Sequence, residues 1–168
     1  MADKVQASNV ISEWGFLVLG YADTDERFFR LVGDAMVKHG WPYPVEKTDV
    51  GEGLFRLRPR PYIKTKAGKL VAYIGSETLS NGKVANSYLN WSLTIADPGI
   101  FKRALAVAGN FSAAVFQEFT FNEINTARAF AALLHACVQE AVDAILDDCQ
   151  INKSEINRTA SGILGGLV

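Results

Sequence analysis

The sequence has little of the material that catalysis or covalent cross-linking requires. It contains two histidines and two cysteines, and it shows no phosphate-binding glycine loop, no nucleophile elbow, no H-E-x-x-H motif and no paired C-x-x-C. Cys137 and Cys149 fall in one predicted helix about 18 Å apart, too far to bridge each other. We therefore predict reduced thiols, no catalytic residue, no metal site, no cofactor and no enzymatic activity.

The chain also lacks a long apolar run and a marked excess of one charge. The longest uncharged stretch of predicted helix spans residues 129–139, short of the roughly twenty residues that a membrane span needs. The first apolar run, residues 16–19, is too short for a signal sequence. A net charge of −1 argues against a dedicated binder of duplex DNA. These features predict a soluble, cytoplasmic protein without a membrane partner.

What the chain does contain is a run of alternating character between Phe55 and Ala67. Cations or tyrosine occupy the even positions from 56 to 66, and apolar or neutral residues occupy the odd positions. Side chains of a strand alternate between its two faces, so an extended conformation places the cations together. The basic strand face defined in this way consists of Arg56, Arg58, Arg60, Tyr62, Lys64 and Lys66.

The basic strand face has two interpretations. Charged residues and prolines protect exposed edge strands, and Pro59 and Pro61 cannot donate to a ladder, so we expect an edge strand. Five cations on one face, however, repel one another unless negative charge lies nearby. We therefore predict a contact with an acidic protein surface or with a second copy of the chain. Single-stranded nucleic acid is an alternative partner, because arginine binds phosphate and tyrosine stacks on bases.

Periodicity along the chain predicts one α+β domain over residues 1–149. Helical spacing indicates helices at residues 24–39, 98–107 and 122–149. Strand patterns are expected at residues 14–21, 45–50, 55–67, 70–74, 88–95 and 111–121. The expected architecture is a mainly antiparallel sheet of about five or six strands, packed against the long C-terminal helix and one or two shorter helices.

Local signals fix several ends of these elements. Thr120 and Glu123 have the spacing of a capping box at the start of the long helix. Gly40 is predicted to end the helix at residues 24–39 as a left-handed C-cap, and residues 66–69 are predicted to form a hairpin turn. His135 belongs to a polar stripe of the long helix and is expected at the surface.

The C-terminal tail, residues 150–168, is polar until Ala160 and then becomes apolar. Disordered tails are usually polar, so this one is expected to dock onto its own domain, a neighbouring subunit or a partner. Its predicted contact residues are Ile163, Leu164, Leu167 and Val168.

Together these patterns favour a non-enzymatic interaction or assembly module, such as an adaptor, a chaperone-like protein or a structural subunit, that forms a homo-oligomer. Its contacts would be the basic strand face and the apolar tail. Two alternatives stay open. One is a single-stranded nucleic-acid-binding protein, and the other is an enzyme or small-ligand carrier with a pocket between the sheet and the long helix.

Overall fold

A computed structural model describes most of the chain, namely residues 3–5, 10–19, 25–51, 60–80, 85–96, 120–150 and 158–162. Some predicted features lie outside these ranges. They are the helix at residues 98–107, the strand at residues 111–121 except its last two positions, and the contact residues Arg56, Arg58, Ile163, Leu164, Leu167 and Val168.

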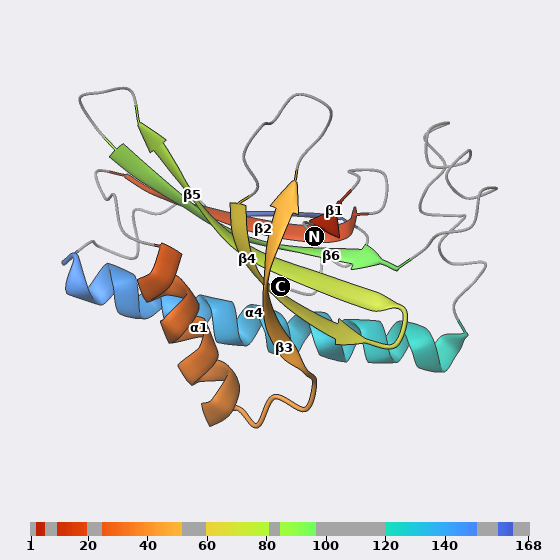
Figure 1. Cartoon of the computed structure of the whole chain (residues 1–168). Helices are drawn as coiled ribbons and strands as arrows, with labels where there is room; N and C mark the ends of the chain where they lie inside the picture. Colours follow the sequence, from red (N-terminus) through yellow and green to blue (C-terminus); the bar gives the residue numbers. More distant parts are fainter. Residues whose placement is uncertain are drawn as a thin grey trace.

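The described strands form one seven-stranded sheet in the order β1-β3-β4-β5-β6-β2-β7 (Figure 1). Neighbouring strands pair antiparallel, except that β1 runs parallel to β3. The predicted α+β fold with a mainly antiparallel sheet is confirmed. The strands are β1 (Asp3–Lys4), β2 (Val10–Val18), β3 (Val45–Gly51), β4 (Arg60–Ala67), β5 (Leu70–Ser80), β6 (Ala85–Ile95) and β7 (Arg158–Gly162).

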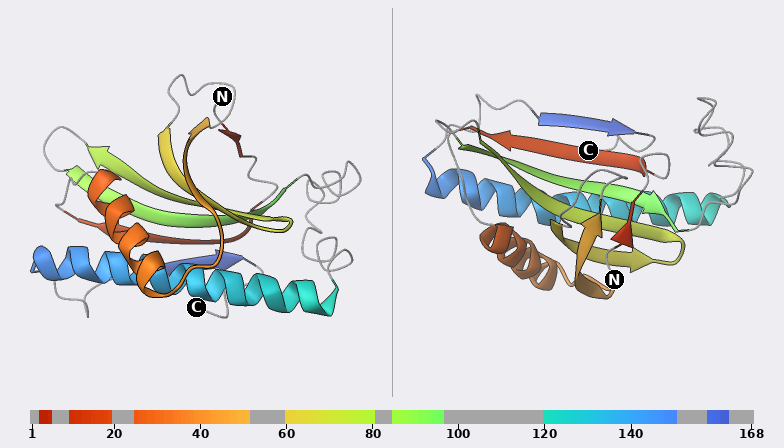
Figure 2. Two further views of the ribbon diagram at one scale, coloured as in Figure 1. Left: turned by 60° about the horizontal axis from the view of Figure 1, so that its bottom comes forward. Right: turned by 45° about the horizontal axis from the view of Figure 1, so that its top comes forward.

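Two helices, α1 (Asp25–Lys38) and α4 (Phe121–Asp148), lie on the same side of the sheet (Figure 2). By length and composition α4 could cross a membrane, but half of that apolar stretch is buried inside the protein, which is consistent with the core helix of a soluble protein. Its buried residues are Ala127, Phe130, Ala131, Leu134, Cys137, Val138, Ala141, Val142, Ile145 and Leu146.

Ion pairs fasten α1 to α4. Arg27 pairs with Asp148, and the Glu140 carboxylate lies 2.6 Å from Lys38 Nζ and 2.8 Å from His39 Nε2. The hydrogen bonds from Lys38 and His39 hold the pKa of Glu140 below its usual value. Negative charge near the C-terminal end of α4, which the helix dipole disfavours, is thereby compensated by α1.

The side of the sheet that faces the helices carries most of the buried apolar residues of the strands. On β6, Leu89, Trp91 and Leu93 are at most 2% exposed. Polar residues at the alternate positions of β6 point to the other side, as the sequence predicted. Three strands extend clearly beyond their predicted ends: β2 begins at Val10, β5 ends at Ser80 and β6 begins at Ala85.

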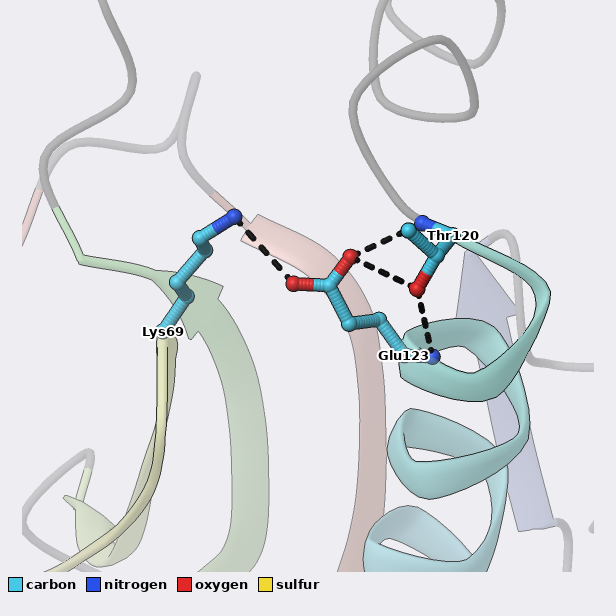
Figure 3. Close-up of polar contacts among 3 residues, drawn as sticks. All are labelled: Lys69, Thr120 and Glu123. Atoms are coloured by element: carbon cyan, nitrogen blue, oxygen red, sulfur yellow. Dashed lines mark hydrogen bonds and ion pairs between the residues drawn. The ribbon is translucent and has the colours of Figure 1, made fainter.

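The start of α4 is held by the predicted capping box (Figure 3). Thr120 Oγ1 accepts a hydrogen bond from the Glu123 backbone N–H at 3.3 Å, and the Glu123 carboxylate accepts one from the Thr120 backbone N–H at 2.8 Å. Lys69 Nζ lies 3.2 Å from the same carboxylate. The hydrogen bond from the Thr120 backbone, followed by that from Lys69, lowers the pKa of Glu123.

Glycine allows the chain to reverse at two predicted positions. Gly40 follows α1 with φ of 65°, and Gly68 joins β4 to β5 with φ of 60°. Both values lie in the left-handed region, which a Cβ disfavours. The predicted C-cap and hairpin turn are therefore confirmed.

The prediction of an edge strand for the basic strand face is wrong. β4 pairs with β3 on one side and with β5 on the other. Pro61 is tolerated because it lies near the start of β4, opposite Asp49 and one residue before pairing with β5 begins at Tyr62. Pro61 therefore lies just outside the β4–β5 ladder, on a strand that is inside the sheet.

The surface position predicted for His135 is also wrong. The side chain is half-buried, and its ring centroid lies 5.1 Å from that of Trp14. Trp91 Nε1 donates a hydrogen bond to His135 Nδ1 over 3.4 Å. Because α4 packs against β6, this part of its polar stripe meets tryptophans instead of water.

Replacement of the cap residue tests the role of the capping box. Thr120→Ala should lower the free energy of unfolding by about 1 kcal/mol, because the N–H of Glu123 loses its acceptor. Urea denaturation measures this change. Thr126→Ala, at an exposed position within α4, should have little effect, and equal shifts for both variants would contradict the capping role.

The two cysteines should differ in reactivity. Burial raises the pKa of Cys137 to about 11, so its thiol stays protonated and covered at about pH 8, whereas Cys149 is only half-buried. A disulfide reagent such as DTNB should modify one thiol rapidly in the native protein and the second only in denaturant. Cys149→Ser should remove the rapid phase.

The pKa of Cys137 is raised in the folded protein, so the stability that its neutral thiol contributes is lost as the pH rises through about 11.

Candidate functional site on the open face of the sheet

The side of the sheet opposite α1 and α4, called the open face here, is not covered by either described helix (Figure 2). Strand register and alternation decide which side chains lie on it. They include the even positions of β4, the odd positions of β5 and alternate positions of β6 and β2. The residues considered below are Glu13, Gly15, Leu17, Glu46, Arg60, Tyr62, Lys64, Lys66, Tyr73, Gly75, Glu77, Leu79, Tyr88 and Asn90.

Carboxylates of the same chain compensate most of the described basic strand face. Arg60 forms an ion pair with Glu77 on β5. Lys64 Nζ lies 2.7 Å from Asp3 and 3.1 Å from Glu46. The alternation predicted for this strand is confirmed, since Arg60, Tyr62, Lys64 and Lys66 lie on the face opposite the buried Ile63, Thr65 and Ala67. The uncompensated charge that suggested an acidic partner is absent at Arg60 and Lys64.

A small polar cluster joins β1 to the middle of the sheet. The Asp3 carboxylate contacts Lys64 and also accepts a hydrogen bond from the Tyr73 hydroxyl at 3.2 Å. The hydrogen bond to Asp3 raises the pKa of Lys64, and burial together with the negative charge of Asp3 raises the pKa of Tyr73 to about 12. Near neutral pH the lysine of the cluster is therefore charged and its phenol is neutral.

Two tyrosines of the open face lie over glycines of neighbouring strands. A Cβ at Gly75 would overlap the Tyr62 ring, and one at Gly15 would overlap the phenol end of Tyr88. Asn90 lies between the glycines, because it pairs with Gly75 on one side and with Gly15 on the other. We call these five residues the tyrosine row.

Two polar groups of the tyrosine row have no partner among the described residues. The half-buried amide of Asn90 and the hydroxyl of Tyr88 form no hydrogen bond with any other residue in the described ranges. Burial, followed by the nearby charge of Glu13, raises the pKa of Tyr88, so the phenol is neutral and can donate. The row thus presents an amide and a hydroxyl beside aromatic carbon.

An apolar patch adjoins the tyrosine row at one end of the open face. It consists of Leu17, Leu79 and Tyr88, which are 40%, 46% and 36% exposed. Leu17 is opposite Tyr88 in the β2–β6 ladder, and Glu77 is opposite Tyr88 in the β5–β6 ladder. The patch therefore crosses three neighbouring strands and is bordered by the Arg60–Glu77 ion pair.

Sequence reasoning identified Tyr62 but missed the rest of the row and the patch. Alternation over Tyr73, Gly75, Glu77 and Leu79 could have extended β5 and placed Leu79 on this face. Nothing in the sequence indicates that Tyr62 lies over Gly75, because the contact depends on which strands pair. Among the described residues, no group of three or more metal-ligating side chains comes together.

No family model, curated protein or solved structure matches the chain.

The Asp3 cluster should hold β1 in place. Lys64→Met should lower the free energy of unfolding by about 1 kcal/mol and speed amide exchange at Val50 and Gly51, which face β1. Lys66→Met is the matched control on the same face, because Lys66 is exposed. Equal amide exchange in the two variants, measured by NMR or mass spectrometry, would show that the cluster does not anchor β1.

Proposed function

We propose that this protein is a non-enzymatic interaction module that binds a segment of a partner protein on the open face of its sheet. The observation that carries the proposal is the apolar patch, in which three large side chains are exposed on three neighbouring strands. Large apolar side chains exposed near one another and bordered by charged residues are typical of interaction sites.

The size of the patch favours an extended segment over a folded partner. Adjacent strands are about 4.8 Å apart, and successive residues on one face of a strand are about 7 Å apart, so the patch measures about 10 Å across the strands and about 7 Å along them. A standard interface between folded proteins buries about 800 Å² on each partner. A peptide segment of a few residues covers the patch and reaches the adjoining tyrosine row.

The charges of the open face favour a segment without a strong charge of its own. Arg60 and Lys64 are already paired with carboxylates, so an acidic partner would compete with contacts inside the chain. A nucleic-acid strand would in addition approach Glu13, Glu46 and Glu77, which lie on the same face. An uncharged segment neither competes with these ion pairs nor is repelled by these carboxylates.

Selection from a random peptide library tests the proposal. Phage-displayed peptides panned against the wild-type protein should yield binders, and Leu79→Glu should weaken these at least tenfold because a charge replaces apolar contact. Val37→Glu is the control, because Val37 is 84% exposed on α1, on the other side of the sheet. Fluorescence polarisation of labelled peptides measures the affinities.

Two outcomes would contradict the proposal. One is that no peptide is enriched, or that the enriched peptides bind the Leu79→Glu and Val37→Glu variants equally well. The other is that the wild-type protein is a dimer by light scattering and Leu79→Glu makes it monomeric. A second copy of the chain would then be the occupant of the patch.

A further inference from the structure

The tyrosine row runs across the strands with a defined spacing. Gly75 and Gly15 are two strands apart, with Asn90 on the strand between them. At about 4.8 Å for each strand, the aromatic surfaces over the two glycines lie about 10 Å apart. A ligand that contacts both rings therefore needs two flat apolar groups separated by about this distance.

A polyproline II helix has this repeat. It has three residues per turn and rises about 3.1 Å per residue, so residues i and i+3 lie on the same side about 9.3 Å apart. Proline rings at these positions can rest on Tyr62 and Tyr88 together. Aromatic-lined surfaces are the usual binding sites for this conformation, which loses little entropy on binding because it is already formed.

The polar groups of the row suit the same ligand. A polyproline II helix has no internal hydrogen bonds, so its backbone carbonyls need donors from outside. The Asn90 amide, which forms no hydrogen bond to another described residue, lies between the two ring positions and can donate to such a carbonyl. The Tyr88 hydroxyl, over Gly15, is a second donor.

We infer that the partner segment is proline-rich and binds in the polyproline II conformation, with prolines on Tyr62 and Tyr88 and a carbonyl accepting a hydrogen bond from Asn90. This inference rests on the proposed function and specifies its partner. Two features support this inference. One is the distance between the rings of Tyr62 and Tyr88, and the other is the Asn90 amide, a hydrogen-bond donor that lies between them.

Titration with a ten-residue all-proline peptide, followed by calorimetry, tests the inference. The wild-type protein should bind the peptide saturably and should not bind a glycine-serine peptide of equal length. Asn90→Ala and Tyr62→Ala should each weaken binding at least tenfold, whereas Tyr62→Phe should retain most of the affinity. Lys66→Ala, on the same face but outside the row, is the control. Circular dichroism confirms that each variant folds.

Three results would overturn the inference. The first is the absence of saturable binding, and the second is an equal affinity of the Asn90→Ala and Lys66→Ala variants. The third is binding of a β-linked glucose oligomer, which also presents flat faces at regular spacing, in place of the peptide. If random peptides without proline are selected and depend on Leu79, the interaction function stands and only the polyproline assignment fails. If no peptide of any kind binds, both fail.

Discussion

A single layer of helix on one side of the sheet is the constraint on which the rest of the structure depends. α4 and α1 cover the side that carries Trp14, Trp91 and the other apolar strand residues. Because strand side chains alternate, every second residue is left on a side where no described helix can bury it. Some of those residues are charged and pair with one another, as Arg60 does with Glu77, and others, such as Leu17 and Leu79, stay exposed. Val50 and Val71 lie on the same side and are at most 6% exposed.

Several charges among the described residues are compensated within the chain. The sequence has 17 basic and 18 acidic residues, and strand pairing brings opposite charges together, as with Lys64 and Asp3 or Arg60 and Glu77. The ion pair of Arg27 with Asp148 does the same between the helices. Such pairs add little stability singly, but those of Arg60 and Lys64 reduce the self-repulsion expected of the basic strand face. What remains unexplained on the open face is apolar and aromatic.

The sequence predicted interactions within a few residues and missed those that depend on strand order. The capping box of Thr120 and Glu123 and the alternation of β4 are local patterns, and both were predicted correctly. The ion pair that compensates Arg60 involves a residue 17 positions away, and the hydrogen bond of Tyr73 involves one 70 positions away. Such contacts are created by topology, which periodicity does not encode. The same reason explains why β4 was wrongly placed at an edge.

Stability alone does not account for the tyrosine row. Glycine within a strand costs about 0.5–1 kcal/mol relative to alanine, and a ring above it recovers part of this by covering the backbone. The side-chain amide of Asn90 forms no hydrogen bond with another described residue, and threonine or valine would suit a strand better. Two glycines and an asparagine in one row are therefore unfavourable choices for strands, and positions that break local rules without a structural gain are expected at binding sites. A ligand that supplies an acceptor to Asn90 and apolar surface to both rings would restore what the row lacks.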